Sequence, residues 1–191
     1  MTKDYWNSRY KNHQTGWDLG AVSPPIKAFA DGIENKDLKI LIPGAGNAYE
    51  AECLFKNGFR NVFLCDIAEI PLNSFSLRNP EFPEDQMLHQ DFFKIENSFD
   101  LILEQTFFCA LPVTKRSAYA QKTSELLRSG GVLAGLLFNF ELKEDGPPFG
   151  GSREEYLTYF SPYYHIEILE KAYNSIKPRL GTELFFKFRK K

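Results

Sequence analysis

Hydrophobic positions occur in short runs along the chain, and most runs are separated by segments long enough for one helix. The runs predict strands at 38–43, 61–66, 86–90, 99–104, 131–139, 164–169 and 182–189. The intervening segments predict helices near 3–12, 23–33, 47–58, 69–78, 114–128 and 152–160. Strands that alternate with helices in this way predict an α/β protein, with a mostly parallel sheet covered by helices on both faces.

The last part of the chain follows a different pattern. The runs at 164–169 and 182–189 are joined by a segment that contains Pro178 and Gly181 and has no helical periodicity. We therefore expect a hairpin there, which adds an antiparallel edge strand to a seven-stranded sheet. The Pro/Gly-rich stretch at 145–151 lies between a strand and a helix of one pattern, so it is predicted as an active-site loop rather than a domain linker.

Size and charge indicate a single domain with a small partner. The 191 residues suffice for one domain, spanning 1–191, that buries roughly 70% of its unfolded surface. A net charge of -2 produces no field that would gather nucleic acid or anionic lipid. The 18 Phe and 9 Tyr are many for this length, and most of them are expected in the core.

The cysteines and the first residues bear on the compartment. Cys53, Cys65 and Cys109 lie in apolar surroundings without C-x-x-C spacing, which predicts neither a disulfide framework nor a metal site. The first residues lack the apolar core of a signal peptide, and no run approaches the roughly 20 residues of a membrane span. We expect a cytoplasmic protein without membrane association. Its oligomeric state is left open, and a monomer is compatible with the sequence.

A glycine-rich turn after the first predicted strand is the strongest chemical signal. Gly44 and Gly46 follow this strand, and Asp66 ends the next one, 20 residues after Gly46. Glycines let a ligand approach the backbone, and an acid at the end of the second strand can accept hydrogen bonds from a ribose. Tyr49 stands where a nicotinamide fingerprint has its third glycine, and no Lys-Ser or Lys-Thr follows as in a phosphate-binding loop. Alone, the turn could also be structural.

Two further strand ends carry polar residues. Asp91 and Phe92 follow the third predicted strand, where the acid can accept from an exocyclic amine while the phenyl ring packs on a base; a helix cap is the alternative. Gln105 lies at the carboxyl end of an apolar strand, where open α/β sheets bind ligands. The stretch 126–133 predicts a helix that is stopped by glycine and followed by another strand.

Together these four signals predict a site for S-adenosylmethionine in a Rossmann-like class I methyltransferase. The amino-terminal segment from Trp6 to Gly20 resembles the signature of the thiopurine methyltransferase superfamily, and more specifically its thiol and halide methyltransferase branch. The stretches 43–46, 107–110 and 146–149 resemble further motifs of that branch, in the same order. The resemblance covers nearly the whole chain.

The resemblance implies a set of cofactor contacts and a covering segment at 1–22. The contacts that it implies, with Gly46 of the same turn, are Trp6, Tyr10, Trp17, Gly44, Gly46, Asp66, Asp91, Phe92 and Gln105. Tyr10 stands where the plant thiol and halide enzymes usually have Trp. Gln105 stands where they have Tyr and the thiopurine enzymes have Arg, so the acceptor is left open.

The expected chemistry is methyl transfer by in-line displacement to a hydrosulfide-like thiol, a halide or thiocyanate, leaving S-adenosylhomocysteine. Such a nucleophile needs positioning and desolvation more than a general base, and no convincing base, catalytic residue or metal-ligand cluster is visible. The aromatic Trp6, Tyr10 and Trp17 can attract a sulfonium cation. Acceptor contacts are expected from Trp17, Phe149 and Arg179; the alternative role of Arg179 is to cap the last hairpin.

Three other functions are compatible with parts of this pattern. A thiopurine-like enzyme that methylates aromatic thiols is the nearest. A non-catalytic protein that binds S-adenosylmethionine or its product is the second. A nicotinamide-dependent oxidoreductase is the third, but the chain lacks the third glycine and a Tyr-x-x-x-Lys arrangement.

Overall fold

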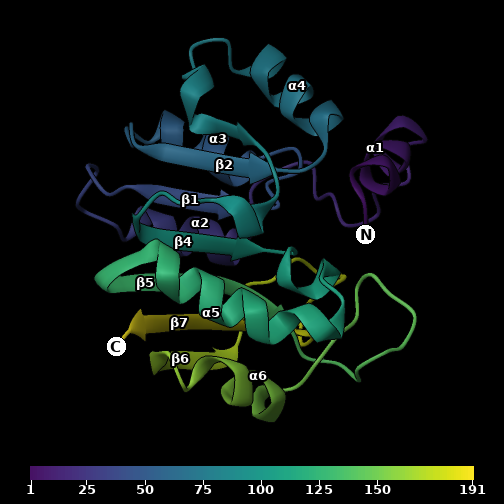
Figure 1. Ribbon diagram of the computed structural model, residues 1–191, viewed down its shortest axis with the longest axis vertical. Helices are drawn as coiled ribbons and strands as arrows, with labels where there is room; N and C mark the ends of the chain where they lie inside the picture. Colours follow the sequence, from purple (N-terminus) through teal and green to yellow (C-terminus); the bar gives the residue numbers. More distant parts are fainter.

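The computed structural model describes all 191 residues and contains one seven-stranded sheet with the order β3-β2-β1-β4-β5-β7-β6 (Figure 1). The strands are β1 (Ile40–Pro43), β2 (Val62–Asp66), β3 (Met87–His89), β4 (Phe99–Gln105), β5 (Leu127–Phe138), β6 (Tyr164–Lys171) and β7 (Glu183–Lys190). Strands β1 to β5 pair in parallel, and β7 pairs antiparallel with both β5 and β6. The expected hairpin at this edge is confirmed; β7 lies one place inside the edge strand β6.

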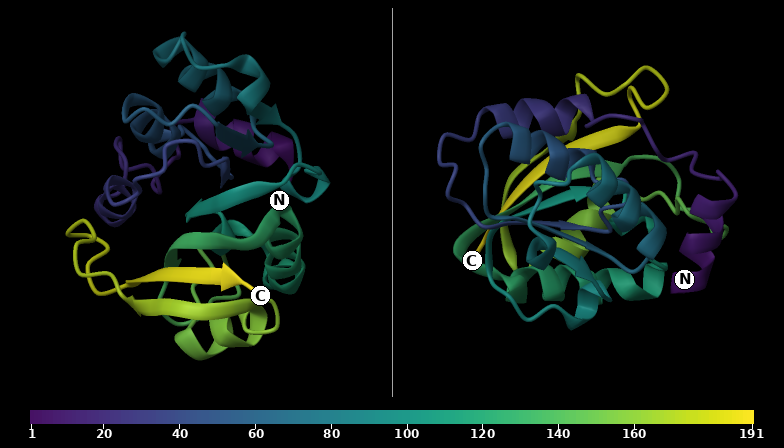
Figure 2. Two further views of the ribbon diagram at one scale, coloured as in Figure 1. Left: turned by 90° about the vertical axis from the view of Figure 1, so that its left-hand side faces the viewer. Right: turned by 90° about the horizontal axis from the view of Figure 1, so that it is seen from above.

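Helices cover both faces of the sheet, as the alternating pattern predicts (Figures 1 and 2). They are α1 (Lys3–Lys11), α2 (Pro24–Asp31), α3 (Tyr49–Lys56), α4 (Glu69–Arg78), α5 (Arg116–Leu126) and α6 (Arg153–Phe160), with 3-10 turns at Glu84–Gln86, Phe92–Lys94, Phe108–Ala110 and Val113–Lys115. One buried cluster joins α2, α3 and α4 to one sheet face, and a second joins α5 and α6 to the other. None of the helices is both long and apolar enough to cross a membrane.

The junction of α5 and β5 differs from the sequence-based expectation. The helix ends at Leu126 without a glycine cap, and Leu127 already has extended backbone angles. Leu127 pairs with Phe99 of β4 and is 2% exposed, so its burial in the sheet ends the helix. Gly130, with φ of 71°, lies in an irregular part of β5 between the pairings of Leu127 and Val132. The predicted glycine stop is therefore wrong, and the glycine serves a bulge in the strand.

The carboxyl ends of β1 to β5 meet at one edge of the sheet, because these strands are parallel. Helix α1 lies beyond this edge, on the same side as the loop that follows β5 (Figure 1). The chain's amino terminus is at this side, and its carboxyl terminus is at the opposite edge. The fold thus brings the first residues over the strand ends that carry the predicted site.

Asn7 fastens α1 to the sheet domain. Helix α4 has Ala68 at its N-cap position and therefore no side-chain cap of its own. The Asn7 side-chain oxygen accepts hydrogen bonds from the backbone N–H groups of Glu69 (3.1 Å) and Ile70 (3.2 Å). A residue of α1 thus provides the cap that α4 lacks, and the same contact holds α1 in place.

Replacing Asn7 with Ala is expected to lower the free energy of unfolding by about 1 kcal/mol, because two helix N–H groups lose their acceptor. Asn7→Asp keeps an oxygen acceptor and places a negative charge at a helix N-terminus, so it should retain most of the stability. Urea denaturation of the three proteins measures both effects. Equal stability of the Ala variant and the unaltered protein would contradict the capping role.

Candidate functional site

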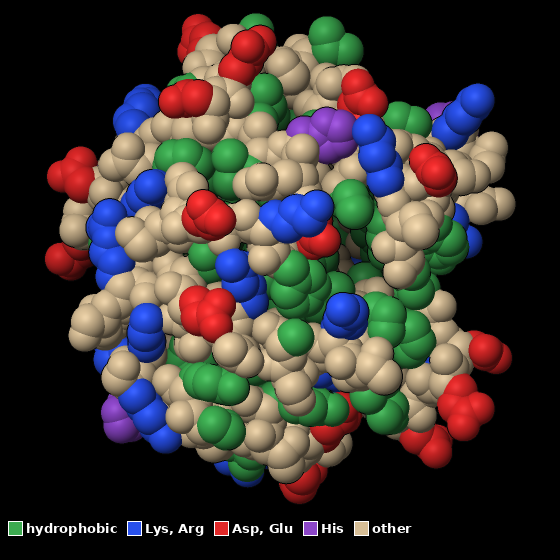
Figure 3. Space-filling view, viewed as in Figure 1, with side chains coloured by type: hydrophobic (Ala, Val, Ile, Leu, Met, Phe, Trp, Pro, Cys, Tyr) green, Lys and Arg blue, Asp and Glu red, His purple; other side chains and the backbone are tan.

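A cavity of about 720 Å³ opens at the carboxyl edge of the sheet, under α1. This volume is within the range of small-molecule and cofactor sites. Its walls come from the segment 1–21, the loops after β1 to β5, and the segment before β7. In Figure 3 hydrophobic side chains gather beside the hollow between α1 and the rest of the molecule.

The glycine turn after β1 forms the floor and leaves no room for side chains. Gly44 and Gly46 have φ values of 58° and 52°, which favour glycine. A Cβ on Gly44 would lie 2.2 Å from the ring of Phe107, and one on Gly46 would lie 2.7 Å from the Tyr10 hydroxyl. The turn therefore requires glycine both for its backbone angles and for the close approach of two aromatic side chains.

Asp66 at the end of β2 is tied to this turn. Its Oδ2 accepts a hydrogen bond from Gly46 N at 2.8 Å, and its Oδ1 accepts from Ala68 N at 2.8 Å. Burial raises the pKa of Asp66, and the backbone donors oppose that shift. The 20-residue spacing in the sequence thus corresponds to direct contact between the acid and the glycine turn.

Asp91 and Phe92 extend the cavity wall beyond β3. The Oδ1 of Asp91 accepts from Phe93 N at 3.0 Å and caps the short 3-10 turn that follows. Asp91 also lines the cavity, so it both caps this turn and lies at the predicted site. Phe92 is 4% exposed and meets Phe107 edge to face, with 5.4 Å between ring centroids.

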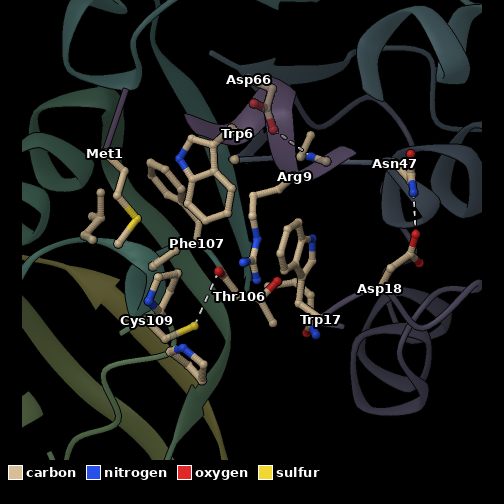
Figure 4. A pocket seen from close by; sticks show the side chains of 18 of the residues that line it. Met1, Trp6, Arg9, Trp17, Asp18, Asn47, Asp66, Thr106, Phe107 and Cys109 are labelled. Atoms are coloured by element: carbon tan, nitrogen blue, oxygen red, sulfur yellow. Dashed lines mark hydrogen bonds between the residues drawn. The ribbon is translucent and has the colours of Figure 1, made fainter. Parts of the chain in front are cut away.

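Aromatic side chains of the amino-terminal segment cover the cavity. The ring of Trp17 is nearly perpendicular to those of Trp6 and Tyr10, at centroid distances of 5.4 Å and 5.7 Å. Both indoles point into the cavity in Figure 4. Burial raises the pKa of Tyr10, with a smaller contribution from the negative charge of Asp66, so its hydroxyl stays protonated.

The end of β4 is organised by Glu104, which is completely buried. Its Oε1 accepts hydrogen bonds from the N–H groups of Phe107 and Phe108, each at 2.8 Å, and its Oε2 accepts from the Tyr119 hydroxyl at 2.7 Å. Loss of hydration raises the pKa of Glu104 to about 7, and these three donors oppose the rise. From the sequence, Glu104 is only a polar residue at a strand end, and its role as acceptor for the following loop is not predicted.

Gln105 and Thr106 follow Glu104 and reach the cavity. The Gln105 Oε1 accepts from the Ser23 hydroxyl at 3.4 Å, which links the strand end to the residue before α2. Thr106 has a φ of 59°, and this turn directs the chain into the wall formed by Phe107. Cys109 is 6% exposed and donates to Thr106 O at 3.4 Å. Burial raises the pKa of its thiol, so it is not activated as a nucleophile.

The predicted acceptor contacts are only partly assembled. Arg179 lines the cavity and donates to Trp17 O (2.7 Å) and to Glu183 (3.3 Å), which ties the segment before β7 to the amino-terminal segment. Phe149 does not line the cavity. Its ring lies against Gly146, while its backbone bonds to Lys143 and Cys109. Pro147 and Pro148 form the wall in its place.

Several lining residues are not anticipated by the sequence analysis. Glu50, in the first turn of α3, lines the cavity and is 8% exposed. Burial raises its pKa to about 6, and the positive charge of Arg179 opposes that shift. Phe138, the last residue of β5, and Phe140 complete an apolar wall. An acid four residues after a glycine turn is the signal that points to Glu50. No group of three His, Cys, Asp or Glu residues is placed to hold a metal ion.

The strand order arranges these features in a line. Moving across the sheet edge, the cavity meets Asp91 after β3, Asp66 after β2, Gly46 after β1 and Gln105 after β4. Neighbouring strands are about 4.8 Å apart, so these four positions span roughly 14 Å. A carboxylate with an adjacent phenyl ring, a second carboxylate and a turn with two glycines therefore follow one another along this edge, in the order that the sequence predicts for a nucleoside joined to an amino acid.

The fold defines the class of protein. A methyltransferase from Burkholderia thailandensis that acts on 1,6-didemethyltoxoflavin, solved with S-adenosylhomocysteine, matches with a TM-score of 0.77 and 17% identity, over 98% of this chain and 86% of that one. Magnesium protoporphyrin IX methyltransferase from Synechocystis, solved with S-adenosylmethionine, gives 0.76 and 14%, over 99% and 95%. The chain thus has the Rossmann-like fold of S-adenosylmethionine-dependent methyltransferases.

The family follows from the sequence comparisons. Residues 1–185 match the thiopurine S-methyltransferase family model, and the chain belongs to this family of S-adenosylmethionine-dependent methyltransferases. A probable thiol methyltransferase 2 of Arabidopsis thaliana is 29% identical, over 97% of this chain and 84% of the relative. A thiocyanate methyltransferase 1 of Brassica oleracea is 27% identical over the same shares. A thiopurine S-methyltransferase of Vibrio cholerae is 26% identical, over 82% and 80%.

The buried Glu104 predicts a pH dependence of stability. Its pKa is about 7 in the folded chain and about 4.5 when the carboxyl is exposed in the unfolded chain, so its contribution to the free energy of unfolding is complete below pH 4.5 and is lost as the pH rises through 7. Glu104→Gln can accept from Phe107 and Phe108 and donate to Tyr119 without ionising. As the pH rises from 5 to 8, we expect the free energy of unfolding of the variant to increase by about 1–3 kcal/mol relative to that of the unaltered protein. Urea denaturation measures this; parallel pH curves would contradict it.

Proposed function

We propose that this protein transfers a methyl group from S-adenosylmethionine to a small thiol such as hydrosulfide, or to a halide or thiocyanate. The observation that carries this proposal is the composition of the cavity beyond β4. Its walls there are Trp17, Phe138, Phe140, Pro147 and Pro148, and no histidine lines any part of the cavity. Such walls suit a small, soft nucleophile that arrives already ionised. The likeness to the thiol and thiocyanate methyltransferases supports the same acceptors.

We infer the cofactor contacts from the order of the residues along the carboxyl edge of the sheet. We assign the ribose to Asp66, the adenine to Asp91 and Phe92, and the methionyl part to the turn at Gly44 and Gly46. The segment 1–22 covers them and brings Trp6, Tyr10 and Trp17 to the sulfonium. Aromatic faces attract such a cation by about 0.5–2 kcal/mol, and more where water is excluded.

The reaction needs alignment more than acid or base chemistry. The acceptor donates the electron pair of the new bond to the methyl carbon, and the pair of the broken carbon–sulfur bond stays on sulfur as neutral S-adenosylhomocysteine. Holding the two reactants in line is worth roughly 7–11 kcal/mol in favourable cases. Trp17, Gln105 and Phe107 supply the wall against which this alignment occurs, and Arg179 fixes Trp17 through its carbonyl oxygen.

A second acceptor class is favoured by one feature of the cavity. The rings of Phe138 and Phe140 both line the cavity, with centroids 5.0 Å apart and planes tilted by 42°, and aromatic walls of this kind also suit an aromatic thiol such as a thiopurine. The likeness to the Vibrio cholerae thiopurine S-methyltransferase agrees with this alternative.

The cysteines bear on where the protein acts. The free thiols of Cys53, Cys65 and Cys109 fit a reducing compartment, and we propose the cytoplasm.

Calorimetric titration with S-adenosylhomocysteine tests the assigned cofactor site. We expect binding by the unaltered protein and about a tenfold loss of affinity in Asp66→Asn, because an amide is a weaker acceptor for ribose hydroxyls than a carboxylate. Asp31→Asn, at an exposed carboxylate of α2 that pairs with Lys27 outside the cavity, is the matched control and should bind normally. Absence of binding by the unaltered protein at millimolar ligand would overturn the proposal.

Headspace mass spectrometry with hydrosulfide, iodide, thiocyanate and a thiopurine in parallel tests the acceptor. We expect volatile methylated products from the small anions and little turnover of the thiopurine. Gln105→Tyr restores the residue of the plant enzymes, and we expect it to change the ratio of hydrosulfide to iodide turnover severalfold without loss of S-adenosylhomocysteine binding. Cofactor binding without turnover of any acceptor would favour a non-catalytic binding protein, and preferential turnover of the thiopurine would favour the second acceptor class.

A further inference from the structure

The positive charge of the Arg9 guanidinium is not paired with any negatively charged group of the protein. It lies on α1, one turn after Trp6, and its side chain points into the cavity between the indoles of Trp6 and Trp17 (Figure 4). The carbon of its guanidinium is 5.7 Å from the centre of the Trp17 ring and 6.0 Å from that of Tyr5. Its Nε is buried and has no hydrogen-bond partner, and the side chain forms no ion pair.

Two other cationic side chains line the cavity, and both differ from Arg9. Arg179 donates to Trp17 O and to Glu183, so its charge is neutralised within the protein. Lys115 is exposed to solvent at the rim, 5.9 Å from the ring of Phe93. Arg9 alone combines a position inside the cavity with a buried donor that lacks an acceptor. Such a donor costs free energy unless a ligand supplies the acceptor.

The carboxylates of the cavity do not serve Arg9. Asp18 accepts from Gly20 N and from the Asn47 side chain. Asp66 accepts from two backbone N–H groups, as described above, and Asp91 from one. Glu50 lies in α3, and it is Arg179, not Arg9, whose positive charge lowers its pKa. The anion that complements Arg9 must therefore come from a ligand.

Electrostatics indicates which ligand supplies the negative charge that Arg9 lacks. S-adenosylmethionine brings a positive sulfonium into the same cavity, and two cations in a low-dielectric space repel each other unless an anion accompanies them. The guanidinium offers five N–H donors, and two aromatic rings limit its hydration. The negative charge of an anion held by Arg9 offsets the charge of the sulfonium, and a thiol bound there is favoured in its ionised form.

We propose that Arg9 binds the methyl acceptor as an anion and thereby selects anionic nucleophiles over neutral ones. The identity of this anion as the acceptor rests on the proposed function, whereas anion binding by Arg9 does not require turnover. The competing source of the same charge is the carboxylate of the methionyl part of the cofactor. The experiment separates these two sources.

The two tryptophans of the chain, Trp6 and Trp17, flank Arg9 and provide reporters. Protein saturated with S-adenosylhomocysteine is titrated with sodium thiocyanate at constant ionic strength, and the two indole N–H resonances are followed by NMR. We expect thiocyanate to shift them. In Arg9→Gln its dissociation constant should rise about tenfold or more, the usual effect of losing a charge-assisted hydrogen bond. The affinity for S-adenosylhomocysteine should change less than about threefold.

Two further variants control for structure. Lys11→Gln removes the same charge from an exposed position of α1 and should leave both affinities unchanged. Arg9→Lys keeps the charge and should retain most of the thiocyanate affinity. If Arg9→Gln does not fold, Arg9→Met replaces it, because its aliphatic chain can pack between the indoles.

Three results would overturn the inference. An unaltered thiocyanate affinity in Arg9→Gln, or no thiocyanate binding by the unaltered protein, would show that Arg9 does not bind the acceptor anion. A tenfold loss of S-adenosylhomocysteine affinity in Arg9→Gln would assign the guanidinium to the cofactor carboxylate. None of these results contradicts the proposed methyl transfer, which fails instead if the unaltered protein does not bind S-adenosylhomocysteine or turns over no acceptor.

Discussion

The buried carboxylate of Glu104 holds the centre of this structure together. It receives two backbone N–H groups from the loop after β4 and the hydroxyl of Tyr119 from α5. That loop carries Phe107, whose ring occupies the space beside Gly44 and contacts Phe92. The glycine turn, the wall beyond β3 and the helix layer thus all depend on where one side chain places the end of β4.

The position of Glu104 has an energetic cost. Three donors favour the ionised carboxylate, yet burial outweighs them and raises its pKa to about 7. An apolar residue in the same place would leave two backbone N–H groups and a hydroxyl without acceptors, which costs about 1–3 kcal/mol for each buried group. The carboxylate therefore fixes the geometry of the loop, and the apolar clusters on the two sheet faces stabilise the fold.

Most of the fold could be predicted from the sequence, because strands and helices follow from periodicity and from the burial of one face. The exceptions have local causes. The glycine at 130 has the form of a helix stop, but the burial of Leu127 against β4 ends α5 earlier. Phe149 lies in a loop whose path no periodicity describes, and its ring turns against Gly146 instead of the cavity. The roles of Glu104 and Arg9 depend on side-chain direction, which spacing along the chain does not determine.

The arrangement of the cavity separates what the fold fixes from what it leaves variable. The positions assigned to the nucleoside lie directly at the ends of β2 and β3, where backbone hydrogen bonds hold Asp66 and Asp91. The side of the cavity that we propose for the acceptor is lined by irregular segments: residues 12–23, the loop after β5 and the stretch before β7. Because loops change with little effect on a sheet, one fold can keep its cofactor site while the charge and shape around the acceptor change. In this chain an unpaired charge in the cavity, that of Arg9, comes from α1 and therefore from an element outside the sheet.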